Sequence, residues 1–169
     1  MLVGVISDTH DNFRAVRSAL DVFMRRGVDL IIHCGDFVAP FTLKMFGESG
    51  VKLIGVFGNN DGEKVLLSRV SSELGFELVD QPMVKEIAGI KALIMHGCGS
   101  VERTVALAEE LVKSFDLVVY GHTHLVNVKR VGESLILNPG EAHGLLSGRA
   151  TVALLELPSL SVEVVEISF

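Results

Sequence analysis

The sequence predicts an α/β domain built on mixed β-sheets, and three observations point to it. Short apolar runs rich in Val, Ile and Leu recur along the whole chain. In the first half they alternate with stretches that carry apolar residues at helical spacing, which is typical of a parallel sheet. The second half shows strand–turn–strand patterns, which indicate antiparallel pairs or a second sheet. With no internal repeat or composition break, we expect one domain over residues 1–169.

The predicted strands are short, and the first few are apolar almost without interruption, as expected of strands buried on both faces. They lie at residues 2–7, 30–35, 51–58, 92–96, 117–121, 134–138, 151–157 and 161–167. Two hairpins are also predicted, because glycine-containing turn signals stand between strand-like runs. One hairpin covers residues 84–95 around Ala88-Gly89, and the other covers residues 126–137 around Gly132-Glu133.

Helices are predicted where apolar residues form a stripe between a capping residue and a stop signal. The first such stripe begins after Asn12, a suitable N-cap, and ends before Gly27. Another covers residues 101–112 after a Ser100 cap. Less regular patterns predict two further helices, at residues 39–47 and 63–74.

The composition limits the partners and the location of the protein. The formal net charge is −6, with 15 basic against 21 acidic residues, so stable nucleic-acid binding is not expected. A phosphate-bearing substrate stays compatible with this charge, because bound metal ions reverse the local sign. No apolar run approaches the roughly 20 residues of a membrane-spanning helix, and no signal peptide is recognisable. We therefore expect a cytoplasmic protein without membrane contact. The composition is compatible with either a monomer or a homo-oligomer. Cys34 and Cys98 are expected to be reduced, buried thiols.

Polar residues gather where five of the predicted strands end. The motifs are Ser7-Asp8-Thr9-His10, His33-Cys34-Gly35-Asp36, Gly58-Asn59-Asn60-Asp61, Met95-His96-Gly97 and Gly121-His122-Thr123-His124. Loops at the carboxyl ends of strands in open α/β sheets bind ligands, so these five should converge in one crevice. Asp and Asn offer oxygen and His offers neutral nitrogen to divalent ions. The set therefore predicts a metal site, and the glycines beside Asp36, Asn59, His96 and His122 are expected to let the backbone turn tightly.

Each motif taken alone also has a structural interpretation. Asp8 and His10 suit a helix cap and a surface histidine, Gly35-Asp36 suits an ordinary turn, and His96 suits a satisfied core position. His122-x-His124 is harder to explain structurally, because paired histidines after an apolar strand have little packing purpose. Four of the six histidines are candidate ligands in these strand-end positions, which favours ligation over coincidence; they are His10, His96, His122 and His124.

The order of these motifs along the chain resembles the calcineurin-like metallophosphoesterase superfamily. Three features resemble its small YfcE-like phosphodiesterase branch. They are the short chain, the motif His33-Cys34-Gly35-Asp36, and Asn138-Pro139-Gly140 followed by the strand Thr151–Leu157. The resemblance covers the chain from Asp8 to the final strands. It implies a four-layer αββα sandwich, in which helices flank two packed mixed sheets.

The resemblance also implies two divalent metal ions and divides the ligands between them. Asp8, His10, Asp36 and His124 would hold one ion, and Asp36, Asn59, His96 and His122 would hold the other. Asp36 would bridge the ions, and Asp36, Asn59 and His96 are the expected catalytic residues. Mn is the expected metal, although Fe, Zn, Co or Ni would also suit this mixed oxygen and nitrogen set.

The implied activity is that of a phosphodiesterase, which hydrolyses small phosphodiesters or nucleotides through a hydroxide that bridges the metals. A nuclease is disfavoured by the acidic charge and by the lack of a basic, aromatic-rich stripe. The alternative is a catalytically weak, metal-binding scaffold or protein-interaction module like the retromer subunit of the same fold. That subunit lacks parts of the ligand set, whereas every ligand position is filled in this chain.

The chain departs from the family pattern at two places that concern substrate binding. Asn60 stands where many members carry a histidine that protonates the leaving group, and an amide cannot act as a general acid at neutral pH. We therefore expect a preference for esters whose leaving groups depart easily. Glu141 stands where the branch usually has Ser, and His143 follows it. His143 has two interpretations: it contacts the substrate or donates a proton to it, or it is an exposed loop histidine. Arg103 and Arg149 are interpreted either as phosphate contacts or as solvated surface charges.

Overall fold

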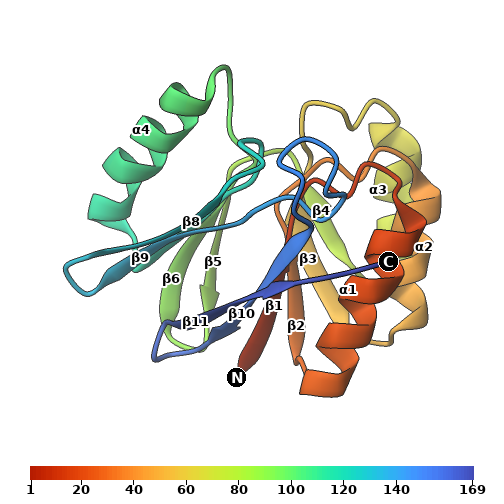
Figure 1. The fold of residues 1–169 in the computed structure, drawn as a ribbon, viewed down its shortest axis with the longest axis horizontal. Helices are drawn as coiled ribbons and strands as arrows, with labels where there is room; N and C mark the ends of the chain where they lie inside the picture. The colour runs from red at the N-terminus through yellow and green to blue at the C-terminus, as the bar shows by residue number, and fades with distance from the viewer.

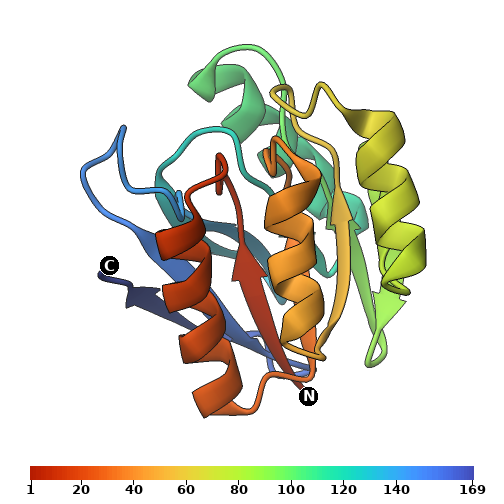
Figure 2. The same ribbon diagram turned by 90° about the vertical axis from the view of Figure 1, so that its right-hand side faces the viewer.

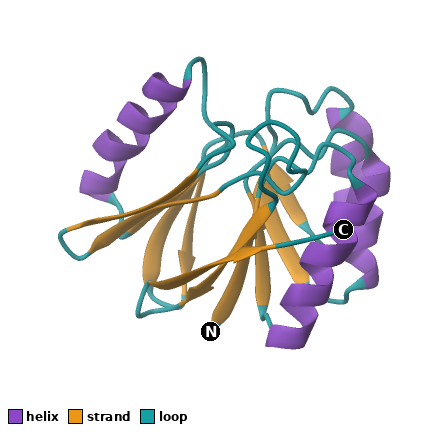
Figure 3. Cartoon of the chain, in the orientation of Figure 1, coloured by secondary structure: helices purple, strands orange, loops and turns teal.

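Two β-sheets pack face to face between outer layers of helix, and the chain is described over residues 1–169 by a computed structural model. Figure 1 shows α1, α2 and α3 together on one outer side and α4 on the other. Figure 3 shows the same layers by type, with helices outside and strands inside. The predicted four-layer sandwich of mixed sheets is therefore confirmed.

The first sheet has six strands in the order β11-β10-β1-β2-β3-β4. Strands β1, β2, β3 and β4 are parallel, and β10 and β11 add an antiparallel edge. The strands are β1 (Leu2–Ile6), β2 (Leu30–His33), β3 (Lys52–Val56), β4 (Glu77–Val79), β10 (Thr151–Glu156) and β11 (Ser161–Glu166). The sequence did not predict β4, because three residues with one buried member are too short to form a recognisable pattern.

The second sheet has five strands in the order β5-β6-β7-β9-β8. These strands are β5 (Met83–Ile87), β6 (Ile90–Ile94), β7 (Leu117–Val119), β8 (Val126–Val131) and β9 (Ser134–Pro139). Both predicted hairpins are present, as the antiparallel pairs β5–β6 and β8–β9. Ala88 and Gly89 both have positive φ, at 49° and 80°, which matches the twist of a two-residue hairpin turn.

All four predicted helices form: α1 (Phe13–Arg26), α2 (Pro40–Glu48), α3 (Lys64–Glu73) and α4 (Val101–Leu111), the last followed by a 3₁₀ turn, η1 (Val112–Ser114). The side chain of Asn12 accepts a hydrogen bond from the Ala15 amide, and Gly27 ends α1 with φ at 69°. Ser100 caps α4 by accepting from the Arg103 amide. Figure 2 shows α1, α2 and α3 side by side across one face of the first sheet. None of the helices has the length and apolar content that crossing a membrane requires.

Three layers of buried apolar side chains hold the sheets and helices together. One lies under α1, α2 and α3, one lies between the sheets, and one lies under α4. In β2, Ile31 belongs to the first layer and its neighbour Ile32 to the second, and both are fully buried. Successive side chains point to opposite faces of a strand, so a sheet covered on both sides needs apolar residues at every position. This explains why the early strands are apolar without interruption.

The arrangement of strands brings five loops to one edge of the sandwich. β1, β2 and β3 run parallel in the first sheet, and β6 and β7 run parallel in the second. The loops that follow these strands gather at the top in Figure 3, where the two sheets meet. The predicted strand ends also lie slightly too far along the chain, since residues 95–96 and 120–121 belong to these loops.

Of the two cysteines, Cys34 is buried and Cys98 is exposed, and both are free thiols. The expectation of two buried thiols is therefore wrong for Cys98, because it lies in the open loop that leads into α4. Burial raises the pKa of the Cys34 thiol well above its ordinary value, and the nearby Asp8 carboxylate adds to this effect.

Gly4 offers a test of how α1 packs on β1. A Cβ atom at Gly4 would lie 2.9 Å from the ring of the buried Phe23. We expect Gly4→Ala to lower the free energy of unfolding by about 1–3 kcal/mol, because overpacking a dense core forces side chains from their favoured rotamers. Equilibrium urea denaturation would measure the change. Gly62→Ala is the control, since a Cβ there meets nothing within 4 Å; equal stability of the two variants would contradict the prediction.

Candidate active site

All seven predicted metal ligands lie in the five loops that meet at the sheet edge. Asp8 and His10 follow β1, Asp36 follows β2, Asn59 follows β3, His96 follows β6, and His122 and His124 follow β7. Asp8, Asp36 and His96 are almost completely buried. The loops therefore bring together residues that are more than 100 positions apart in the sequence.

The first group of side chains surrounds one oxygen of Asp8. Its Oδ1 lies 3.9 Å from His10 Nε2 and 3.8 Å from His124 Nε2. Both Asp8 Oδ1 and His10 Nε2 are buried without a hydrogen-bond partner, whereas Asp8 Oδ2 accepts from Ser7 Oγ at 2.6 Å. Ligand atoms that surround a divalent ion at about 2.1 Å lie roughly 3–4 Å from one another. The unpartnered atoms therefore have the spacing that a shared cation requires.

The second group is organised by His96. Its Nδ1 lies 2.7 Å from the carbonyl oxygen of Cys34, which can only accept, so Nδ1 carries the proton. The other ring nitrogen, Nε2, then presents a lone pair, 2.9 Å from Asn59 Oδ1 and 3.4 Å from Asp36 Oδ2. The Nε2 lone pair and the Asp36 carboxylate are two acceptors that face each other, as they would around a shared cation. Metal-binding histidines commonly hold their second nitrogen on a carbonyl in this way.

His122 stands beside His96, with ring centres 5.0 Å apart. Its Nε2 lies 2.8 Å from the carbonyl oxygen of Gly99. The same reasoning places the proton on Nε2 and leaves the Nδ1 lone pair for a ligand. Among the four histidines of the predicted ligand set, His122 is thus the one whose free ring nitrogen is Nδ1 rather than Nε2.

Asp36 lies between the two groups. Its Oδ2 is 3.4 Å from His10 Nε2 and 3.4 Å from His96 Nε2. The side-chain amide of Asn60 donates to the same oxygen at 2.8 Å, and the Asn60 backbone amide donates to Oδ1 at 2.8 Å. One carboxylate therefore faces both groups, as a bridging ligand would. In this arrangement Asn60 contacts Asp36.

Five of the seven predicted ligands have a left-handed backbone conformation. The φ angles are 53° at Asp8, 43° at His10, 60° at Asp36, 65° at His122 and 58° at His124. Such angles are uncommon outside glycine, and sparsely populated conformations of this kind cost about 1–3 kcal/mol each and cluster at functional sites. The loops are thus bent to aim these side chains inward. Nothing in the sequence pattern indicated this strain.

The glycines of these loops serve two different purposes. Gly35 and Gly97 have φ angles of 96° and 127°, so they turn the chain as expected. Gly58 and Gly121 do not have positive φ, and the expectation of a turn is wrong for them. Instead they allow close approach: a Cβ at Gly58 would lie 2.1 Å from Asp36 Oδ1, and one at Gly121 would lie 2.0 Å from Ser7 Oγ.

Two residues outside the predicted ligand set, Asp61 and Gln81, hold the loops in place. Asp61 accepts hydrogen bonds from the backbone amides of Asp36, Gly58 and Val38, at 3.0, 2.7 and 2.7 Å. Burial raises its pKa, although these hydrogen bonds oppose the effect. Gln81 accepts from the His96 amide at 2.8 Å and donates to the Gly97 carbonyl. The turn motif gave a signal for Asp61, whereas Gln81 had none, because its partners belong to a distant loop.

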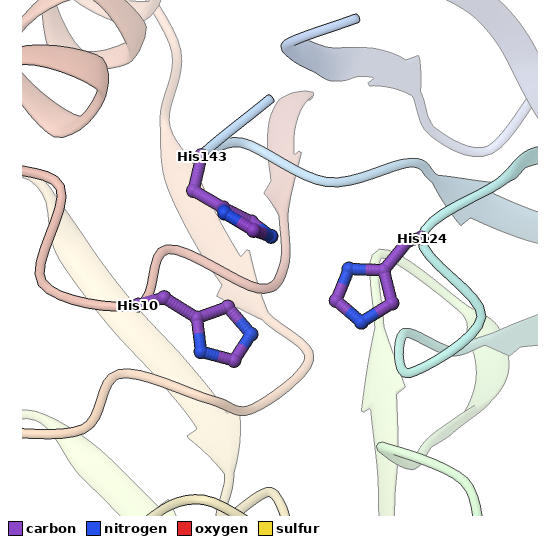
Figure 4. Close-up of side chains that lie close together, drawn as sticks. All are labelled: His10, His124 and His143. Atoms are coloured by element: carbon purple, nitrogen blue, oxygen red, sulfur yellow. The ribbon is translucent and has the colours of Figure 1, made fainter. Parts of the chain in front are cut away.

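His143 is not an exposed loop histidine, and that alternative is wrong. Only 5% of its surface is exposed. Its ring centre lies 4.6 Å from that of His10 and 5.5 Å from that of His124, and Figure 4 shows the three rings turned toward one another. Burial lowers the pKa of His143, and the neighbouring His10 and His124 add to this effect while Glu141 opposes it.

Glu141 is fully buried next to these rings. Its Oε2 lies 2.9 Å from His124 Nδ1, and its Oε1 accepts from the Ser147 hydroxyl at 2.8 Å and from the Leu146 amide at 2.9 Å. Burial alone raises the pKa of Glu141, but the hydrogen bonds from Ser147 and Leu146 and the charge of His143 outweigh it, so the pKa is lowered. The carboxylate therefore orients His124, a role that the sequence did not reveal.

A cavity of about 350 Å³ opens beside His124. It is lined by His124, Leu125, Val126, Ser147, Arg149 and Thr151. Arg149 also contacts Glu166, with its Nη2 3.0 Å from the carboxylate, and Arg103 is exposed on α4. The interpretation of Arg149 as a surface charge fits the structure, and the pairing with Glu166 was not predicted; Arg149 also lines this cavity.

Comparison with known proteins agrees with this geometry. The profile described as the calcineurin-like phosphoesterase superfamily domain matches residues 1–159. Phosphodiesterase MJ0936 of Methanocaldococcus jannaschii is 36% identical over 157 residues, covering 92% of this chain and 93% of that protein.

Solved structures give the same result. A structure described as a novel archaeal phosphodiesterase superposes with a TM-score of 0.89 at 34% identity, covering 98% of this chain and 99% of the other. The phosphoesterase Yfce of E. coli shares the fold, with a TM-score of 0.72 at 22% identity, covering 99% of this chain and 100% of the other. This chain therefore belongs to the calcineurin-like phosphoesterase superfamily.

Proposed function

We propose that this protein is a two-metal phosphodiesterase that hydrolyses small phosphodiesters or nucleotides. The observation that carries the proposal is the set of buried acceptor atoms that face one another without hydrogen bonds, above all Asp8 Oδ1 and His10 Nε2. Leaving such atoms unpartnered is costly unless a cation binds between them. The relationship to a phosphodiesterase at 36% identity supports the same activity.

The donor chemistry supports the division of ligands that the motifs suggested. Asp8, His10, Asp36 and His124 would hold one ion, and Asp36, Asn59, His96 and His122 would hold the other. Two divalent ions bound there would supply an activated water and neutralise the charge of the phosphoryl group. Two dications against the carboxylates of Asp8 and Asp36 leave a local positive charge, which attracts a phosphate ester to an otherwise acidic protein. Mn is the expected ion.

Protein groups behind three of the four proposed histidine ligands fix the orientation of their rings. The carbonyls of Cys34 and Gly99 hold His96 and His122, and the Glu141 carboxylate holds His124. Each contact selects one tautomer, so that the opposite nitrogen is ready to bind without a proton. This preorganisation lowers the cost of assembling the site when the ions and the substrate arrive.

The cavity beside His124 is a suitable place for one arm of the ester. Leu125 and Val126 give it an apolar side, and Ser147 and Arg149 are polar residues of its lining. A planar group such as an aryl ring or a nucleobase matches this mixture of surfaces. We propose that the leaving group or the retained arm occupies this cavity.

The first prediction concerns activity and its dependence on metal. Apo protein should hydrolyse aryl phosphodiesters once Mn²⁺, Co²⁺, Ni²⁺, Zn²⁺ or Fe²⁺ is added, in a screen that also includes aryl phosphomonoesters and cyclic nucleotides. Asp36→Asn should lose at least about 100-fold in kcat/KM and bind less metal, because the bridging charge belongs to both ions. Asp21→Asn, on the exposed face of α1, is the matched control and should behave as the parent.

Failure of every ion to restore hydrolysis of any ester would contradict the proposed activity. If metal still bound under those conditions, the scaffold alternative would be favoured instead. Measuring bound metal alongside the rates separates these two outcomes.

The second prediction concerns Asn60. Lacking a proton donor at this position, the parent enzyme should hydrolyse esters with acidic leaving groups much faster than alkyl esters. Asn60→His should improve kcat on the poor leaving groups by about 10-fold or more, with little change on the good ones, since proton donation contributes about 10²–10⁴-fold in favourable cases. Asn60→Ala is the control, because it removes the contact with Asp36 without adding a donor. An equal response of Asn60→His and Asn60→Ala across leaving groups would argue against this role.

A further inference from the structure

One buried imidazole at the site lies outside the seven-ligand set. His143 is 5% exposed, its Nδ1 has no hydrogen-bond partner, and its Nε2 meets only the Glu141 carboxylate, at 2.6 Å. A buried polar group without a partner costs about 1–3 kcal/mol. The unpartnered Nδ1 therefore indicates that a group outside the protein chain binds to this ring.

The direction of the ring indicates what that is. His10, His124 and His143 each offer a ring nitrogen within 4.8 Å of the other two. Figure 4 shows the three rings entering a common space from three separate loops. Convergent neutral imidazoles are suited to divalent transition metal ions and leave little room for an apolar ligand.

Backbone contacts hold this part of the chain firmly in place. The His143 amide donates to the Asp8 carbonyl at 3.2 Å, and the Ala142 amide donates to the Ser7 carbonyl at 2.9 Å. The side chain of Asn12 donates to the His143 carbonyl at 3.3 Å. His143 is thus fastened to the same loop that carries Asp8 and His10, which fixes its distance from them.

Glu141 supports His143 as it supports His124. Its Oε2 lies 2.6 Å from His143 Nε2 and 2.9 Å from His124 Nδ1. Nε2 thus has a carboxylate partner, whereas Nδ1 has none. A carboxylate beside one ring nitrogen favours the proton there and leaves the other nitrogen free to bind a metal. The Glu141 carboxylate thus orients two imidazole rings, those of His124 and His143.

We propose that His143 is a further ligand of the metal position formed by Asp8, His10 and His124. This inference rests on the proposed function only in requiring that the site binds metal, and it does not require hydrolysis. The position would then contain three imidazoles, against two at the position of Asn59, His96 and His122. Nitrogen ligands favour Co²⁺, Ni²⁺ and Zn²⁺ over Mn²⁺ and Mg²⁺, so the two positions should differ in metal preference.

Cobalt binding to the apo protein tests the proposal. Isothermal titration should show two Co²⁺ ions in the parent, and His143→Ala should weaken one of them by at least about 10-fold. The visible absorption of bound Co²⁺ should also change, because it depends on ligand type and number. Leu145→Ala is the control: it lies two residues away, is 78% exposed and should match the parent.

A second variant separates ligation from a general loss of structure. His143→Cys restores a donor atom and should bind two Co²⁺ ions with a thiolate-to-cobalt charge-transfer absorption that the parent lacks. Unchanged Co²⁺ affinity and spectrum in His143→Ala, with no such absorption in His143→Cys, would overturn the proposal. If KM for an aryl phosphodiester then rose in His143→Ala, the ring would be a substrate contact instead.

These outcomes are distinct from those of the proposed function. Parent protein that binds two Co²⁺ ions but hydrolyses no ester would contradict the phosphodiesterase activity and leave the role of His143 standing. Parent protein that binds no Co²⁺ would overturn both.

Discussion

The position of the Asp36 carboxylate is the constraint on which the site depends. A buried carboxylate is unfavourable unless hydrogen bonds or opposite charge surround it, and Asp36 is 1% exposed. Its backbone amide is held by Asp61, its two oxygens accept from Asn60, and its approach to the β3 loop requires that position 58 have no side chain. With these contacts in place, one carboxylate faces the histidines of both sheets.

The four-layer fold makes that convergence possible. Parallel strands in each sheet carry their loops to the same edge, so the first sheet contributes Asp8, His10, Asp36 and Asn59 and the second contributes His96, His122 and His124. The strained backbone at five of these residues is tolerated because extensive apolar cores hold the strand ends on either side. Stability of the layers and strain in the loops are thus linked.

Groups behind the ligands decide how each histidine can act. Backbone carbonyls at Cys34 and Gly99 select the free nitrogen of His96 and His122, and Glu141 does the same for His124. These partners carry no signature in the sequence, since a carbonyl belongs to every residue. They nevertheless orient His96, His122 and His124 so that each presents one ring nitrogen to the site.

The sequence by itself determined every strand except β4, the four helices, both hairpins and the ordered motifs that place seven polar residues in one family's pattern. These features depend on local periodicity, turn chemistry and residue identity, which a short stretch of chain carries within itself. Only the tertiary structure decided the burial of His143, the orienting role of Glu141 and the hydrogen bonds by which Gln81 holds the His96 loop. Each rests on contacts between distant segments: Asn12 meets His143 across 131 positions, and Gln81 meets the His96 loop only because the sheet pairs β5 with β6. The five-motif pattern thus predicted a candidate metal site, and long-range packing determined which further residues, Glu141 and His143, lie beside it.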